Sequence, residues 1–140
     1  IRQTGFFRSK AKNIIAAARK IASDFGGRVP ETMEELITLP GVARKTANIV
    51  LSSAFHKAEG IAVDVHVARL AQRLGLSREK NPEKIEKNLM ECIPRKEWID
   101  FNYMMVDHGR KVCNARKPLC PECVLRLLCP SADHFMQKSS

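Results

Sequence analysis

A lysine placed just after a tight turn is the first feature of this chain that could do chemistry. Pro40-Gly41 separates two helical patterns, and Lys45 falls in the first turn of the second pattern. The backbone N–H groups at such a helix start attract a phosphate without reading base sequence. A lysine in that place can also act as a nucleophile and form a Schiff base with an electrophilic carbon. These residues indicate chemistry on a nucleic-acid backbone, although an ordinary helix connection with a solvated lysine fits them as well.

Four of the five cysteines stand close together near the end of the chain. Cys113, Cys120, Cys123 and Cys129 follow the spacing C-x6-C-x2-C-x5-C, so four thiolates within 17 residues can surround one metal centre. Zinc and iron–sulfur clusters both take four thiolates, and the spacing alone leaves the two equally open. The fifth cysteine, Cys92, falls on an apolar helical stripe, which predicts a buried core thiol.

Helical periodicity runs through nearly the whole chain and no strand pattern persists, which predicts an all-α fold. The expected helices are Ser9 (as cap) to about Phe25, Thr32 (as cap, in a capping box with Glu35) to about Leu39, Ala43 onward, Asp64 (as cap) to Leu74, Asn81-Pro82 onward, and Glu97 to His108 with Gly109 as its stop. The apolar stripe of the first helix is expected to comprise Ile14, Ala18, Ile21, Ala22 and Phe25. On the helix after the Pro-Gly turn, the polar face is expected to carry Lys45, Asn48 and Ser52.

The charge balance of the chain suits a polyanionic partner. Among 140 residues there are 24 Lys and Arg against 15 Asp and Glu, a formal net charge of +9. No segment approaches the unbroken apolar length of a membrane span. The first residue is Ile1 and the chain opens directly into a helical pattern, so we expect that its beginning is missing.

Two further motifs give the hairpin a family resemblance. The run LPGVARKTAN at residues 39–48, followed by Val63-Asp64-Val65-His66, resembles the helix-hairpin-helix DNA glycosylases. In that family the lysine that matches Lys45 attacks C1′ of a damaged nucleotide, and the aspartate that matches Asp64 is the second essential residue. Relatives that only release the base lack the lysine. The resemblance therefore implies removal of damaged pyrimidines from duplex DNA, coupled to cleavage of the abasic strand by β-elimination.

The physical properties of Asp64 agree with that role. A carboxylate at a helix start can stabilise a cationic sugar transition state or accept a proton from the attacking amine, although a plain helix cap is the default for an aspartate there. One departure from the family concerns Ala43, where relatives usually have glycine. We expect the hairpin to tolerate alanine, while its hold on phosphate is weakened.

The resemblance also implies a cofactor and a DNA-binding surface. The cysteine spacing, preceded by His108-Gly109-Arg110, matches the [4Fe–4S] loop of the family, with all four cysteines as ligands. The residues expected to contact DNA are Gly41, Val42, Ala43 and Arg44 in the hairpin and Arg116 and Lys117 in the cysteine loop. Arg116 and Lys117 could instead offset the negative charge of the cluster.

The implied fold has two parts. Residues 1–58 form the C-terminal part of a six-helix barrel that ends with the hairpin, and residues 59–140 form an iron–sulfur cluster domain. In the family several more helices precede the position of Ile1, and the lysine and the aspartate face each other across the DNA cleft. The full-length protein is expected to be a monomer in the cytoplasm or nucleoid of a prokaryote, or in a nucleus or mitochondrion. A non-catalytic DNA-binding module and a zinc-bound structural domain remain as alternatives.

Overall fold

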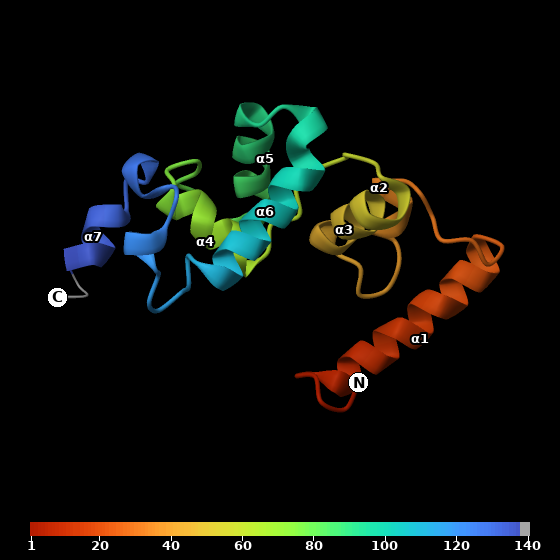
Figure 1. Cartoon of the computed structure of the whole chain (residues 1–140). Helices are drawn as coiled ribbons and strands as arrows, with labels where there is room; N and C mark the ends of the chain where they lie inside the picture. Colours follow the sequence, from red (N-terminus) through yellow and green to blue (C-terminus); the bar gives the residue numbers. More distant parts are fainter. Residues whose placement is uncertain (138–140) are drawn as a thin grey trace. The chain divides into compact units, whose positions relative to one another are not determined.

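Residues 1–137, the part of the chain that the structure describes, form α-helices and short 3-10 helices with no β-strand among them (Figure 1). The structure is a computed structural model. Its internal contacts divide the chain into two units, Ile1–Glu59 and Gly60–Ser140, and each is described by itself. The expected all-α fold is confirmed. The interpretation of the two parts as a partial barrel and a cluster domain stays a prediction, and residues 138–140 of the expected cluster domain lie outside the described residues.

The first unit consists of three helices around a small apolar core. These helices are α1 (Phe7–Asp24), α2 (Met33–Leu36) and α3 (Arg44–Phe55). The buried core comprises Met33, Leu36, Leu39, Ala47 and Leu51, with Ala17, Ile21, Phe25, Val42, Val50 and Phe55 partly buried against it. Most of this core comes from α2, α3 and the turn between them, so burial of apolar surface fixes the shape of the hairpin.

Helix α1 differs from its expected form at its start and along its stripe. The helix begins at Phe7 with Phe6 as its N-cap, so Ser9 lies inside the helix and the expected cap is wrong. Phe6 enters the helix with φ 57°, its carbonyl accepts the first helical bond from the Lys10 N–H, and no side chain caps the N–H groups of the first turn. The expected stripe is only partly right: Ile21 and Phe25 pack against the core, whereas Ile14, Ala18 and Ala22 are exposed. Ala17, which lies outside the expected stripe, contacts the core instead.

The cap of α2 is confirmed. Thr32 Oγ1 accepts a hydrogen bond from the Glu35 N–H at 3.3 Å and donates one to Glu35 Oε2 at 2.8 Å. This reciprocal pair satisfies an N–H group that the first turn of a helix leaves without an internal partner. The short helix α2 is thereby defined at its start and delivers the chain to Leu39 and the turn.

The second unit packs α4 against α5 and α6. Its elements are α4 (Val65–Arg73), α5 (Pro82–Cys92), η1 (Arg95–Glu97), α6 (Trp98–Lys111), η2 (Cys120–Glu122), η3 (Arg126–Leu128) and α7 (Ala132–Gln137). The fully buried side chains include Ile61, Val67, Leu70, Ile85 and Leu89. Asp64 caps α4 and Asn81 caps α5, both as expected. The cysteine-rich segment therefore begins from a helix, α6, that the core holds in place.

Two expectations for this unit are wrong. Gly109 does not end a helix, because α6 continues to Lys111. A Cβ at Gly109 would lie 3.0 Å from His66 Cβ, so this glycine marks the close approach of α4 to α6. Cys92 is exposed rather than buried. It is the last residue of α5.

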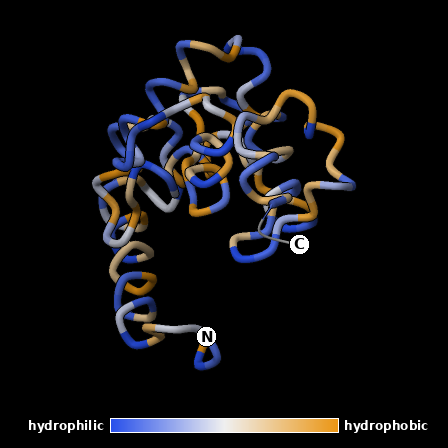
Figure 2. The backbone as a smooth tube through the Cα atoms, turned by 90° about the vertical axis from the view of Figure 1, so that its left-hand side faces the viewer, coloured by the Kyte–Doolittle hydropathy of each residue, from blue (hydrophilic) through white to orange (hydrophobic). Residues whose placement is uncertain are grey.

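No helix in residues 1–137 is long and apolar enough to cross a bilayer. Figure 2 shows hydrophilic and hydrophobic residues alternating along the helices. This is the pattern of helices that bury one face and expose the other.

Candidate functional site

A type II turn joins α2 to α3 and sets the position of Lys45. Pro40 and Gly41 are its central residues, and a 3.0 Å hydrogen bond from the Val42 N–H to the Leu39 carbonyl closes it. Gly41 has φ +80°, the left-handed conformation that a type II turn requires at its third residue and that glycine adopts at little cost. The expected break between the two helices is therefore confirmed in detail.

Gly41 is also in close contact with α1. A Cβ at Gly41 would lie 2.7 Å from Asn13 Nδ2 and 2.8 Å from Asn13 Cβ. These distances are shorter than carbon–nitrogen and carbon–carbon contacts allow, so a side chain at this position would push the turn away from α1. Asn13 thus supports the turn from the side, a role that the sequence did not indicate.

We expect Gly41→Ala to destabilise the protein more than Gly27→Ala. Both glycines have left-handed backbone, with φ +80° and +79°, but no atom lies within 4 Å of a Cβ at Gly27. The φ strain should cost about 1–2 kcal/mol in each variant, and the contact with Asn13 should add about 1–3 kcal/mol in Gly41→Ala alone. Urea unfolding of the two variants measures the difference, and equal losses would contradict the role given to Asn13.

The start of α3 exposes Lys45 beside uncapped backbone. Ala43 is the N-cap in extended conformation, and its side chain supplies no hydrogen-bond acceptor. Lys45, the second residue of the helix, is exposed. The first N–H groups of a helix have no partner within it and attract an anion. Alanine fits at residue 43 without strain, since φ −92° suits any residue, so the expected tolerance of the hairpin is confirmed.

One residue of the expected polar face lies inside the unit. Asn48 is 3% exposed, as deeply covered as the core, whereas Lys45 is exposed. It follows Ala47, which is fully buried, so the covered sector of α3 is wider than the apolar residues alone indicate. The placement of Asn48 with Lys45 on a solvated face is therefore wrong.

Asp64 holds the start of α4. Its Oδ1 accepts hydrogen bonds from the N–H groups of His66 and Val67, both at 2.8 Å. The carboxyl is partly exposed, and it lies between the buried Val63 and the 74% exposed Val65. The double cap fixes this carboxylate at the positive end of the α4 dipole. Lys45 belongs to the first unit and Asp64 to the second, so each is described within its own unit.

The helix that Asp64 caps is tied to the cysteine segment through Arg69. The Arg69 guanidinium donates to the Gly109 carbonyl at 2.7 Å and to the Cys113 carbonyl at 3.2 Å, and it lies 3.1 Å from His66 Nδ1. His66 and Arg69 therefore join the first turns of α4 to the end of α6. His66 has a structural role, since it contacts Arg69 and lies against Gly109.

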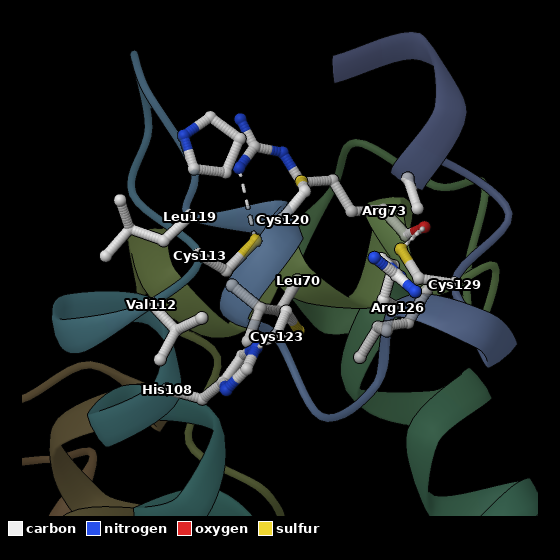
Figure 3. A pocket seen from close by; sticks show the side chains of 13 residues that line it. Leu70, Arg73, His108, Val112, Cys113, Leu119, Cys120, Cys123, Arg126 and Cys129 are labelled. Atoms are coloured by element: carbon white, nitrogen blue, oxygen red, sulfur yellow. Dashed lines mark hydrogen bonds between the residues drawn. The ribbon is translucent and has the colours of Figure 1, made fainter. Parts of the chain in front are cut away.

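The four clustered cysteines line one cavity in the second unit (Figure 3). Its empty volume is about 380 Å³, part of it open to solvent, and its other lining residues are Leu70, Arg73, Leu74, His108, Val112, Pro118, Leu119, Arg126 and Ala132. The lining is mostly apolar apart from the thiols and three basic side chains. Four cysteines that are up to 16 positions apart in sequence thus line one space.

Within residues 1–137 no group of three or more His, Cys, Asp or Glu side chains is placed to hold one metal ion. Burial raises the pKa of the Cys120 thiol, and the neighbouring charges of Cys113, Cys129 and Cys123 raise it further, while Arg73 acts in the opposite direction. His108 Nε2 lies 3.6 Å from Cys123 Sγ.

Arg116 and Lys117 lie between the first two cysteines and are exposed. Neither lines the cavity, whereas Pro118 and Leu119 after them do. Their charges are thus directed to solvent rather than to the space among the thiols. DNA contact by these two residues stays a prediction.

Comparison with known proteins adds three findings. The model of the HhH-GPD superfamily of base excision DNA repair proteins matches residues 1–95. The endonuclease III of Synechocystis sp. is 59% identical over 132 residues, which cover 94% of this chain and 60% of that protein. The chain thus spans about three-fifths of the length of this curated relative.

Two solved structures of DNA complexes are similar as well. One is described as a trapped endonuclease III–DNA covalent intermediate and the other as a non-covalent endonuclease III–DNA complex. Both have a TM-score of 0.91 and 42% sequence identity to this chain. They cover 96% and 97% of the chain, which in turn covers 63% and 64% of theirs.

Proposed function

Because this chain belongs to the HhH-GPD superfamily of base excision DNA repair proteins, we propose that it is part of a DNA glycosylase that also cleaves abasic strands. The observation that carries the proposal is Lys45, which is exposed in the first turn of α3 directly after the type II turn. A similar protein of known structure is described as trapped in a covalent intermediate with DNA, which supports a nucleophile in the family.

The proposed reaction begins at Lys45. Its neutral amine attacks C1′ of the damaged nucleotide, the bond from C1′ to the base breaks, and the base leaves with the bonding electrons and takes up a proton. The sugar ring opens and leaves an iminium between Lys45 Nζ and C1′. Loss of a proton from C2′ then forms the C2′–C3′ double bond and expels the 3′ phosphate with the electrons of its C–O bond. The strand is cut on the 3′ side.

Asp64 is proposed to support the first of these steps. Its carboxylate can stabilise the positive charge that develops on the sugar, or accept the proton that the attacking amine loses. The two hydrogen bonds to Oδ1 hold the Asp64 carboxylate in one orientation. A carboxylate fixed in this way stabilises a developing positive charge better than a freely rotating one does. We therefore assign Lys45 as nucleophile and Asp64 as its partner.

Duplex DNA with a damaged pyrimidine or an abasic site is the proposed substrate. We propose that the hairpin residues Gly41, Val42, Ala43 and Arg44 lie against one phosphate, which the N–H groups at the uncapped start of α3 bind. The Val42 N–H is not one of them, because it closes the turn. The net charge of +9 and the exposed Arg116 and Lys117 supply further attraction to the backbone. This function places the protein wherever genomic DNA is kept, in a prokaryotic nucleoid or in a nucleus or mitochondrion.

Borohydride trapping tests the proposal. The full-length protein is incubated with a duplex that contains one abasic site while borohydride is present, and the products are separated under denaturing conditions. Reduction of the iminium should give a covalent protein–DNA adduct, because the C–N bond becomes permanent. A protein that binds the duplex but forms no adduct would be a non-catalytic DNA-binding module.

We also propose that Cys113, Cys120, Cys123 and Cys129 hold a [4Fe–4S] cluster. The four thiols line one cavity, and four thiolates are the usual ligand set of such a cluster. The C-x6-C-x2-C-x5-C spacing, which matches the cluster loop of the family, favours a [4Fe–4S] cluster over tetrahedral zinc. The basic side chains of Arg73, His108 and Arg126 at the cavity suit an anionic cluster. When bound, the cluster would cross-link residues 113–129 and so hold Arg116 and Lys117 in position.

Metal analysis checks this proposal. We expect iron and acid-labile sulfide in equal amounts, four of each per chain, as the composition of the cluster requires. Replacement of any one of the four cysteines by serine should lower both contents together, while Cys92→Ser should leave them unchanged, since Cys92 lies outside the cavity. A protein that contains zinc without iron or sulfide would contradict the cluster.

A further inference from the structure

Arg73 contacts the cysteine segment at three successive residues. Its Nη1 donates to Cys113 Sγ at 3.2 Å and to the Asn114 carbonyl at 2.8 Å, and its Nη2 donates to the Ala115 carbonyl at 2.8 Å. Figure 3 shows the guanidinium beside the Cys113 sulfur. The guanidinium presents its donors in a fixed planar fork, so it makes these bonds at once with less loss of side-chain freedom than an ammonium group.

The same residue also contacts the other end of the cysteine segment. The Arg73 carbonyl lies 3.5 Å from Cys129 Sγ, and its guanidinium lies over the ring of Phe135 in α7, 4.3 Å from the ring centre. Stacking on an aromatic ring restricts the guanidinium and so prepares it for its hydrogen bonds. Arg73, the last residue of α4, therefore contacts the first and the last of the four cysteines and the helix α7 that follows them.

Arg73 differs from Arg69 and Arg126, two arginines near the same cysteines, in its hydrogen bond to a cysteine sulfur. Arg69 donates to the Cys113 carbonyl rather than to its sulfur. Arg126 lines the same cavity, but within residues 1–137 its guanidinium is not seen bonded to a thiol. Arg126 thus provides a matched control, because it carries the same charge at the same cavity without the bond to sulfur.

A hydrogen bond from a cation to a ligand sulfur changes the properties of an iron–sulfur cluster. It draws electron density from the sulfur and stabilises the reduced form, which carries the greater negative charge, so it raises the reduction potential. The two bonds to carbonyl groups also hold residues 113–115 in place, which should slow the release of the cluster.

We propose that Arg73 is a positioning residue for the cluster, which fixes Cys113 and sets the reduction potential through its bond to the Cys113 sulfur. The inference rests on the cluster proposed above. It goes beyond the four ligands, because it assigns control of the reduction potential to Arg73, a residue of the helix that Asp64 caps.

The test compares Arg73→Gln, Arg73→Lys and Arg126→Gln in the cluster-loaded, full-length protein. We expect Arg73→Gln to lower the reduction potential and to lose the visible absorbance of the cluster about tenfold faster than the unmodified protein in the presence of an iron chelator. Arg73→Lys keeps the positive charge but loses the planar guanidinium. Its reduction potential and its rate of cluster loss should therefore lie between those of Arg73→Gln and the unmodified protein. This variant can still be measured if Arg73→Gln does not assemble a cluster. Arg126→Gln should match the unmodified protein in potential.

The outcomes separate this inference from the one on which it rests. Absence of iron and sulfide from the unmodified protein would overturn the proposal that the four cysteines hold a cluster. If both Arg73 variants hold the cluster and have the reduction potential of the unmodified protein, the role of Arg73 is overturned while the cluster proposal stands. An equal shift in Arg126→Gln would show that charge at the cavity, rather than the bond to sulfur, sets the potential, and would also overturn it.

Discussion

We expect Lys45→Ala to yield no borohydride-trapped DNA adduct and to cut an abasic strand about 10³-fold or more slowly than the unmodified protein. Both losses have one cause, since the adduct and the elimination both require the iminium that the Lys45 amine forms. Gel separation of a labelled duplex under denaturing conditions measures the adduct and the cut strand in one experiment. The fold should be unaffected, because Lys45 is exposed and contributes nothing to the core.

Two further variants separate the nucleophile from its charge. Lys45→Arg keeps a cation at the start of α3, but a guanidinium is not available as a neutral amine, so trapping should be lost here as well. Lys57→Ala removes a positive charge from the same unit, where Lys57 pairs with Glu31 at 2.9 Å, and trapping should persist. An adduct that persists in both Lys45 variants would show that another amine of the protein attacks C1′.

The sequence predicted most of what local chemistry determines. The Pro-Gly turn, the Thr32 cap and the caps of α4 and α5 follow from interactions within three or four residues, and the structure confirms each of them. Grouping of the four cysteines around one cavity follows from their spacing in a short loop. In each case the partners are close in sequence, so the pattern of residue types is enough.

Most errors concern interactions between residues far apart in sequence. Gly109 resembles a helix stop, but its lack of a side chain allows the close approach of α4, which the sequence around it does not show. The roles of Asn13 and Arg73 are not visible in the sequence either, because the turn and the thiol that they contact lie 28 and 40 positions away. The Ser9 error is the local exception, since Phe6, with a left-handed backbone, is the N-cap three residues before Ser9.

The double role of Asp64 makes its substitution informative. Its carboxylate caps α4 through Oδ1 and, in the proposed mechanism, acts on the sugar during base release. Asparagine is about as good an N-cap as aspartate but carries no charge. The two roles can therefore be separated by one substitution, whereas alanine removes both.

We expect Asp64→Asn to lower the single-turnover rate of base excision by about 10²–10⁴-fold, the usual contribution of a positioned acid or base, with little change in thermal stability. Asp64→Ala should lose the same activity and also about 1 kcal/mol of stability, because two N–H groups of α4 lose their acceptor. Asn81→Ala is the matched control, since Asn81 caps α5 with bonds to the N–H groups of Glu83 at 2.8 Å and Lys84 at 3.4 Å. It should lose similar stability and keep its excision rate. Normal excision by Asp64→Asn would reduce Asp64 to a helix cap and leave Lys45 without its proposed partner.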